Sequence, residues 1–240
     1  MRPLTAQELL RVWEQGLGQS PARRSLALLV LAFPETPRDQ LAALSIGQRD
    51  GHLMTLREWT FGDRIESMAR CPRCGEALEL NFGLDDIRVP SPQGSSPDWW
   101  LEQDGYRVRY RLPNSADLEI AGACTDLSEA QEMILARCLL ESAGPDDAPL
   151  PEAVANAVMM AMAEHDPQAD VQLALTCPSC HHAWSAGFDI GAFFWSEITT
   201  WARRVLWEVH RLARAYGWSE GEILALSPQR RQAYLEMVGL

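Results

Sequence analysis

The spacing of apolar residues predicts helices in the first sixty residues of the chain. The predicted helices span about residues 5–17, 21–33 and 47–59. Thr5 and Glu8 form a capping box at the start of the first, and Ser20 before Pro21 marks the start of the second. The N-terminal part is therefore expected to be helical throughout.

The most regular pattern lies near the other end, where one long helix is predicted from about residue 192 to 216. Its apolar positions recur every three or four residues, at Phe194, Ile198, Trp201, Val205, Val209, Leu212 and Tyr216. Gly217 is a typical helix stop, and Ser219 and Ser227 can each cap a shorter helix after it.

Strand-like runs replace helical spacing around two cysteine motifs. These runs cover residues 64–69, 77–82, 171–175 and 183–188. The first two flank Cys-Pro-Arg-Cys at 71–74, and the last two flank Cys-Pro-Ser-Cys at 177–180. A strand, a cysteine knuckle and a second strand, occurring twice, is the layout of a zinc ribbon.

A long segment separates the two motifs. A hairpin is predicted there, with strands at 99–102 and 106–111 joined through Asp104 and Gly105. Capping signals at Ser115, Ser128 and Pro151 predict three helices, to about residues 123, 142 and 164. Polar, Pro- and Gly-containing stretches at 90–98 and 143–149 indicate loops.

The sequence thus predicts an α+β protein: a split zinc ribbon with a large hairpin-plus-helices insertion, flanked by helical N- and C-terminal segments. The expected parts are an N-terminal helical segment, the first ribbon half, the insertion, the second ribbon half and a C-terminal helical segment. Their expected bounds are 1–62, 63–83, 84–168, 169–190 and 191–240.

Four cysteines carry the candidate chemistry: Cys71, Cys74, Cys177 and Cys180. Two Cys-x-x-Cys pairs supply the four soft ligands of a tetrahedral Zn²⁺ site, and such a closed site leaves no position for a catalytic water. The gap is unusual, because a compact ribbon separates its pairs by roughly 15–20 residues and here about a hundred intervene.

Two other interpretations of the cysteines remain open. The pairs can be unrelated reduced thiols, or one of them a thioredoxin-like redox motif, although that motif starts a helix within a βαβ unit, which is not evident here. Cys124 and Cys138 lie in predicted helices and are expected to be free and buried. His181 and His182 can replace a cysteine ligand or hydrogen-bond a thiolate, but with four cysteines present we expect them outside the ligand set.

Composition and missing motifs argue against several classes of function. The chain has 240 residues, of which 47% are hydrophobic, so it can bury a sizeable core. Its net charge of −12 opposes a general nucleic-acid role, because phosphate binding needs clustered positive charge. No segment reaches the ~18 apolar residues of a membrane span, and no signal core is evident, so we expect a cytoplasmic location.

We find no phosphate-binding loop, HExxH or GxSxG motif, and expect no catalytic residues.

The C-terminal part is a candidate for docking to a partner. Arginines fall largely off the apolar stripe of the long helix, and two large aromatics follow close to its end. The expected partner-binding residues are Arg203, Arg204, Arg211, Arg214, Tyr216 and Trp218. The alternative is that the arginines are solvated and that the two aromatics only pack the last helices against the long one.

Several segments resemble a family of bacterial proteins encoded with phage-like contractile injection systems. They are Leu56–Gly62, the stretch CPRCGEALEL, Arg111–Leu118 and His210–Ser227. The family is similar to baseplate hub and tail assembly proteins of contractile-tailed phages, and the resemblance covers most of the chain from about residue 45. It implies a non-enzymatic component or assembly factor, in the cytoplasm or incorporated into a phage-like particle, whose partners are other baseplate or tail proteins.

Three hypotheses result: a baseplate component, a zinc-ribbon adaptor that binds nucleic acid or the transcription machinery, and a thiol redox enzyme. The acidic charge weakens the second, and metal content distinguishes the third.

Overall fold

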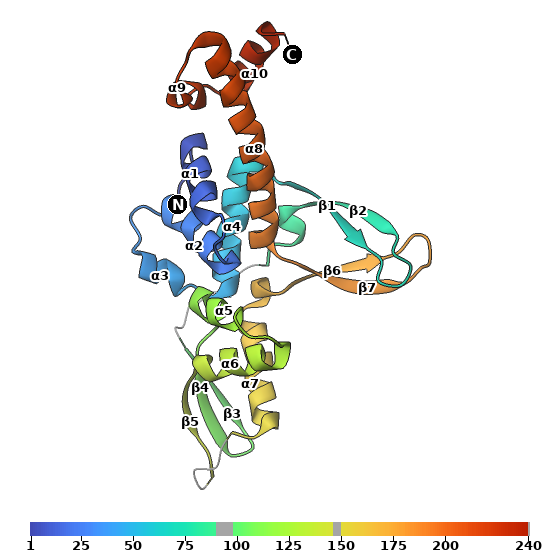
Figure 1. Ribbon diagram of the computed structural model, residues 1–240. Helices are drawn as coiled ribbons and strands as arrows, with labels where there is room; N and C mark the ends of the chain where they lie inside the picture. The colour runs from blue at the N-terminus through green and yellow to red at the C-terminus, as the bar shows by residue number, and fades with distance from the viewer. Residues whose placement is uncertain (90–97, 146–149, 240) are drawn as a thin grey trace.

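The helical body of the molecule is built from the N-terminal segment and the first half of the long helix. The computed structural model describes residues 1–89, 98–145 and 150–239. In it, the body contains α1 (Ala6–Gly16), α2 (Pro21–Ala32), α3 (Arg38–Ala42), α4 (Ile46–Phe61) and the start of α8 (Ile190–Tyr216) (Figure 1). The predicted caps at Thr5 and Ser20 are present, whereas the short α3 was not predicted. Leu29, Leu56 and Phe194 are fully buried in the shared core.

Two β-hairpins extend from this body as an arm, and their tips lie together (Figure 1). The first hairpin pairs β1 (Arg64–Arg70) with β2 (Ala77–Gly83), and the second pairs β6 (Val171–Thr176) with β7 (Ala183–Phe188). Exposure alternates along each strand, as the sequence pattern predicts for a strand with one covered face. Near the base of the arm, Phe82 contacts Phe188 edge to face, with ring centroids 5.6 Å apart.

The segment between the two hairpins forms a separate unit below the body. Its antiparallel sheet has the order β3–β4–β5, with β3 at Trp99–Gln103, β4 at Tyr106–Tyr110 and β5 at Leu139–Ala143. Its helices are α5 (Ser115–Ala121), α6 (Leu127–Cys138) and α7 (Glu152–His165), and the 3₁₀ turns η1 (Leu84–Asp86) and η3 (Pro167–Ala169) lie at its two connections. The predicted turn adopts positive φ at Asp104 and Gly105. Val108, Tyr110, Val154 and Val158 are fully buried between sheet and helices.

The segment that becomes β5 was wrongly predicted to be helical. A helix was expected to continue to residue 142, but α6 ends at Cys138 and the chain passes directly into a strand that pairs with β4. Pairing with β4 overrides the helical preference of this Leu-, Glu- and Ala-containing segment. The α6 cap is Asp126 rather than Ser128, and Asn114 rather than Ser115 caps α5.

Other expectations for this unit need correction or fall outside the described residues. Cys138 is free and buried as expected, but Cys124 is partly exposed and follows the end of α5. The predicted loops at 90–98 and 143–149 lie mostly outside the described residues.

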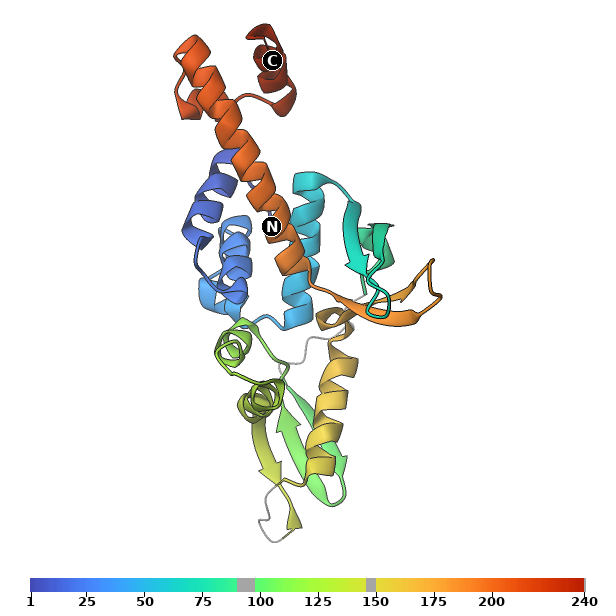
Figure 2. The same cartoon turned by 45° about the vertical axis from the view of Figure 1, so that its right-hand side comes forward.

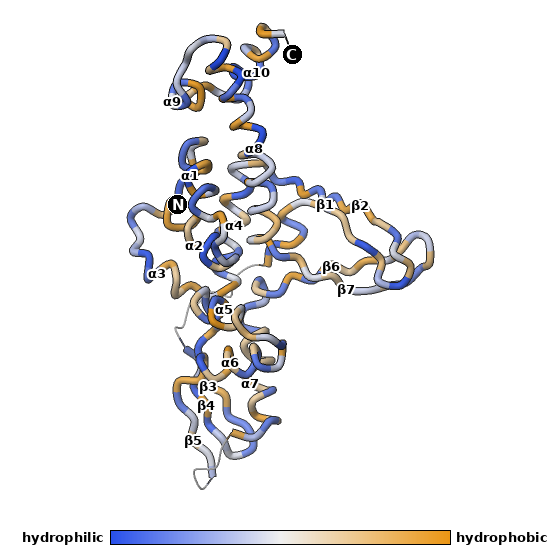
Figure 3. Tube along the Cα trace, in the orientation of Figure 1, coloured by the Kyte–Doolittle hydropathy of each residue, from blue (hydrophilic) through white to orange (hydrophobic). Residues whose placement is uncertain are grey.

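The second half of α8 carries the top of the molecule. Figure 2 shows α8 running beyond the other body helices, and Figure 3 shows apolar and polar residues alternating along it. Gly217 ends the helix in the left-handed conformation, as predicted. Two short helices, α9 (Glu220–Leu224) and α10 (Pro228–Met237), then pack against α8 around residues such as Val205 and Leu212.

Buried polar contacts fix these parts to one another. Arg57 on α4 donates two hydrogen bonds to Glu197 on α8, at 2.9 and 2.6 Å. The carboxylate of Asp166, just after α7, accepts a 2.8 Å hydrogen bond from the backbone N–H of Gly47 at the start of α4. A Cβ at position 47 would overlap the Asp166 carboxylate, so glycine allows this close approach. The observed mixture of helices and strands agrees with the predicted α+β class.

Candidate metal centre

Each cysteine motif forms a tight loop with the same backbone hydrogen bonds. In the first loop, the Cys71 N–H donates to the Glu76 carbonyl and the Gly75 N–H donates to the Cys71 carbonyl, both at 2.9 Å. In the second loop, Cys177 N–H donates to the His182 carbonyl at 2.9 Å, and His181 N–H donates to the Cys177 carbonyl at 3.0 Å. The two loops thus present their cysteines in the same way, and their sequences share the Cys-Pro-x-Cys pattern.

The tips of the two hairpins bring the four cysteine sulfur atoms together. The Sγ atoms of Cys71 and Cys180 lie 3.7 Å apart, those of Cys74 and Cys177 lie 3.5 Å apart, and all four lie within 4.8 Å of one another. Sulfur atoms at about 2.3 Å from one zinc ion stand about 3.8 Å apart in a tetrahedron. A disulfide would instead require about 2.05 Å. The spacing therefore fits four ligands of one ion and not two disulfides.

The cluster is protected on one side only. Cys71 and Cys177 are 2% and 0% exposed, whereas Cys74 is exposed and Cys180 is half-buried. Within the described parts of the chain, these cysteines form the one group of three or more Cys, His, Asp or Glu side chains close enough to share an ion. The donor set is all sulfur, which favours zinc over the oxygen-preferring Mg²⁺ and Ca²⁺.

Four thiols this close together do not ionise independently. Burial raises the pKa of the Cys71 thiol, but the backbone N–H groups of Cys74 and Arg73 and two neighbouring thiols stabilise its thiolate and lower the pKa to about 7. At Cys74, the backbone N–H of Glu76 favours the thiolate, yet the three other thiols and burial raise the pKa to about 12. A bound divalent cation would remove this conflict, because it stabilises every thiolate at once.

The two histidines beside the second motif lie outside the cysteine cluster. His181 is exposed and has a positive φ of 55°, in the position that Gly75 holds in the first loop with a φ of 77°. The His182 ring stacks on Trp184, with centroids 6.1 Å apart and planes 8° apart. In this arrangement, His181 takes the left-handed position of the loop, and His182 packs on Trp184 at the start of β7.

The structure separates the six predicted partner-binding residues into two groups. Tyr216 and Trp218 stack on each other with centroids 4.6 Å apart, and both contact Tyr234 of α10, so they pack the top helices together. Arg203, Arg204 and Arg214 are exposed on α8, and Arg211 is half-buried. Trp207 on the same helix is 50% exposed but was not predicted as a partner-binding residue. Its spacing of four residues from Arg203 and from Arg211 was the signal that it lies on their side of the helix.

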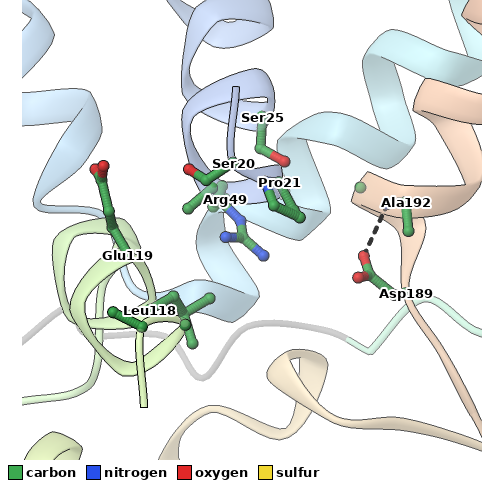
Figure 4. Close-up of a pocket in the computed structure, with 12 residues that line it drawn as sticks. Ser20, Pro21, Ser25, Arg49, Leu118, Glu119, Asp189 and Ala192 are labelled. Atoms are coloured by element: carbon green, nitrogen blue, oxygen red, sulfur yellow. Dashed lines mark hydrogen bonds between the residues drawn. The ribbon is translucent and has the colours of Figure 1, made fainter. Parts of the chain in front are cut away.

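A separate crevice of about 320 Å³ lies where the starts of α2 and α8 meet α4 and α5 (Figure 4). Ser20, Ser25, Arg49, Glu119 and Asp189 contribute its polar side chains. Arg49 is buried and donates from Nε to Asp50 Oδ1 at 2.7 Å, and Asp189 caps α8 through the Ala192 N–H. None of the twelve lining residues is Cys or His, and these polar groups serve helix capping and ion pairing.

Comparison with known proteins points to a phage baseplate. The family model described as T4 bacteriophage base plate protein matches residues 31–142. The match includes α4, the first hairpin with Cys71 and Cys74, and the sheet of the inserted unit as far as Ser142, but not the second hairpin or α8. No curated protein and no solved structure matches the chain. The family match supports a phage baseplate protein, the broader part of the resemblance inferred from the sequence.

Proposed function

We propose that this protein is a non-enzymatic structural or assembly component of the baseplate of a phage-like contractile tail or injection system. The family match over residues 31–142 is the observation that carries this proposal. The proposed partners are other baseplate or tail proteins, and the proposed location is the cytoplasm or the assembled particle. Among the described residues, no helix is both long enough and apolar enough to cross a membrane.

We further propose that Cys71, Cys74, Cys177 and Cys180 hold one structural Zn²⁺. The sulfur separations of 3.5 and 3.7 Å support a tetrahedral site, and four protein ligands leave no open position for water or substrate. The ion would join two hairpins that are distant in sequence, so its binding energy would contribute to folding. In this proposal the chain is a split zinc ribbon, with parts 63–83 and 169–190 separated by an insertion at 84–168, and with helical segments at 1–62 and 191–240.

The metal proposal is tested by single cysteine substitutions. We expect the purified protein to contain one zinc per chain, and Cys71→Ser and Cys177→Ser each to lose it and to melt at a lower temperature. Cys124→Ser is the matched control, because Cys124 is a partly exposed thiol outside the cluster. Zinc is measured by mass spectrometry of the metal. Full zinc occupancy in both cluster variants would show that the site is not shared by the two motifs.

The baseplate proposal is tested by assembly. The protein is co-expressed with candidate baseplate proteins from the same genome, and we expect a complex of defined stoichiometry in size-exclusion chromatography with light scattering. The adaptor hypothesis makes a different prediction, namely tight and sequence-selective binding of DNA or RNA in a mobility-shift assay at physiological salt. The net charge of −12 leads us to expect only weak, non-specific binding there.

A further inference from the structure

The upper half of α8 has two faces of different chemistry. One face is apolar and packs against α9 and α10. The other carries a stripe of cationic, aromatic and imidazole side chains with one residue or two on each successive turn. We call this the α8 stripe, and it consists of Arg203, Trp207, His210, Arg211 and Arg214. Because residues three and four apart share one side of a helix, these five side chains form a continuous surface.

The arginines of the stripe have no acidic partner within the described chain. Arg203, Arg211 and Arg214 take part in no ion pair among the described residues, whereas the adjacent Arg204 pairs with Glu208 at 3.6 Å. The guanidinium carbon of Arg211 lies 4.9 Å from the centre of the Trp207 ring. A groove of about 530 Å³ follows this side of α8, lined by four stripe residues together with Ala215 and Val238.

A second exposed Trp–Arg contact elsewhere on the molecule shows what the stripe lacks. Trp100 on β3 is 46% exposed, close to the 50% of Trp207, and Arg107 lies 4.3 Å from its ring centre. There, Arg107 pairs with Glu102 at 3.3 Å, and the neighbouring Arg109 pairs with Glu141 at 2.6 Å. The same residue types are thus neutralised by the chain at Trp100 and left uncompensated at Trp207.

We propose that the α8 stripe binds an acidic segment of another baseplate protein, whose carboxylates pair with the three arginines while an apolar side chain packs on Trp207. The proposal rests on the proposed function only for the identity of the partner. Arg203 and Arg214 are eleven positions apart, so the partner must present its carboxylates over about 17 Å. Trp and Arg are also the residue types that most often dominate binding energy at protein interfaces.

Protein is a better match to this surface than nucleic acid. Three unpaired arginines on a chain of net charge −12 give a short positive stripe within a repulsive field for a polyphosphate. An acidic protein segment needs only local complementarity, and the guanidinium groups match carboxylates in a two-pronged geometry.

The test uses charge reversal on the full-length, zinc-loaded protein. The stripe variant is Arg203→Glu/Arg211→Glu/Arg214→Glu. The matched control is Arg38→Glu/Arg64→Glu/Arg230→Glu, which changes the net charge equally at three exposed arginines without ion pairs among the described residues. The probe is a fluorescein-labelled peptide in which Glu and Leu residues alternate. The reference peptide has Lys in place of each Glu. Affinity is measured by fluorescence anisotropy at about 0.15 M salt, where exposed charges beyond about 8 Å are largely screened.

We expect the wild-type and control proteins to bind the acidic peptide and not the Lys peptide. We expect the stripe variant to bind it at least tenfold more weakly. Trp207→Ala is expected to weaken binding severalfold with little change in salt dependence, and Trp100→Ala is its matched control. Circular dichroism and zinc content verify folding. If the triple variant fails this check, Arg211→Gln and Trp207→Ala decide the question, and unchanged binding in both would overturn the proposal.

Two further outcomes separate this proposal from the proposed function. If the stripe variant still assembles with the baseplate proteins as the wild type does, the stripe is not the docking surface and the baseplate assignment stands. If the wild type binds the acidic peptide through the stripe but forms no baseplate complex, the surface stands and the assignment fails. Tighter binding of a 20-base-pair duplex than of the acidic peptide, abolished in the stripe variant, would overturn the proposal in favour of nucleic acid.

Discussion

The arm and the inserted unit are both built from short antiparallel strands, but they are stabilised by different means. In the inserted unit, a third strand and α7 cover the hairpin and bury residues such as Val108 and Tyr110 completely. In the arm, Ile65 is the one buried residue of the four strands, and residues such as Leu80 and Leu175 are only half-buried. The cysteine cluster sits at the far tips, where apolar packing is weakest.

The difference follows from what a two-stranded hairpin can bury. A lone hairpin is marginally stable in water, and it becomes stable with a third strand or a packed helix. The inserted unit has both additions. The arm has no third strand and packs against helices only at its base, through residues such as Ile65 and Phe188. The stability of its outer part therefore depends on joining the two hairpins at their tips. In physical terms, the proposed zinc ion would do at the tips of the arm what the apolar core does in the inserted unit.

The largest expected effect is the removal of metal. Treating the protein with a strong chelator under reducing conditions should open the arm and leave the inserted unit folded. Hydrogen exchange measured by mass spectrometry should show loss of protection in 64–83 and 171–188 and little change in β4 and β5. The stability that the arm can lose is at most the apparent ~10–16 kcal/mol with which structural zinc binds small peptides. Equal loss of protection in both regions would show that they unfold together.

The second prediction concerns a substitution that should destabilise the inserted unit and leave the arm unchanged. Asp117 is fully buried in the inserted unit, where its carboxylate accepts hydrogen bonds from Arg111 at 2.6 and 2.9 Å and from Arg137 at 2.8 Å. Asp117→Asn leaves these arginines without their counter-charge, and we expect a loss of about 3 kcal/mol, because both arginines retain some contact with water. Exchange of the β4 amides reports this loss, and zinc content should not change.

The control for that prediction is Glu102→Gln. Its ion pair with Arg107 is exposed on both sides, with 73% and 60% of the side chains accessible. Exposed pairs contribute about 0–1 kcal/mol, so the control should be close to the wild type. A similar loss in both variants would mean that burial of the Asp117 cluster contributes little.

The stability of the inserted unit should depend on pH through Asp117, which the arm lacks. Burial raises the pKa of Asp117, but hydrogen bonds from Arg111, the Asn114 N–H and Arg137 outweigh it, so the folded pKa lies below the usual value. A lowered carboxyl pKa adds stability that is present above the unfolded value of about 3.9 and is lost as pH falls through the folded value. We therefore expect the β4 amides to lose protection only below about pH 4. Asp117→Asn should abolish this particular dependence.

Sequence alone could predict most of the arm and less of the inserted unit. Strand alternation and the Cys-x-x-Cys spacing are local signals, and the structure shows both hairpins and brings the four sulfur atoms together. Leu139–Ala143 carries no such signal, because it becomes a strand only through its pairing with β4. Binding of zinc stays a prediction, since sulfur geometry shows what the site can hold. The α8 stripe was only partly foreseen. Packing of Tyr216 on Tyr234 depends on a tertiary contact, whereas Arg204 pairs with Glu208 one turn further along the same helix, which is a local signal.

The smallest predicted effect compares the two cysteine loops within the arm. Both loops need a left-handed residue at the same place, and the chain uses Gly75 in one and His181 in the other. Nothing lies within 4 Å of a Cβ added at Gly75, so Gly75→Ala tests backbone conformation alone. A left-handed conformation is unfavourable for alanine by about 1–2 kcal/mol, and we expect the arm to lose about that much.

His181→Gly should change much less. Glycine removes the strain of the positive φ, but it also makes the unfolded loop more flexible by roughly 0.5–1 kcal/mol, so the two contributions nearly cancel. The rate of zinc transfer to a chelator measures both variants on the same scale, and Gly75→Ala should release metal about tenfold faster than His181→Gly. If His181→Gly instead releases zinc as fast as Gly75→Ala, the histidine side chain supports the metal directly, and the equivalence of the two loops is limited to their backbones.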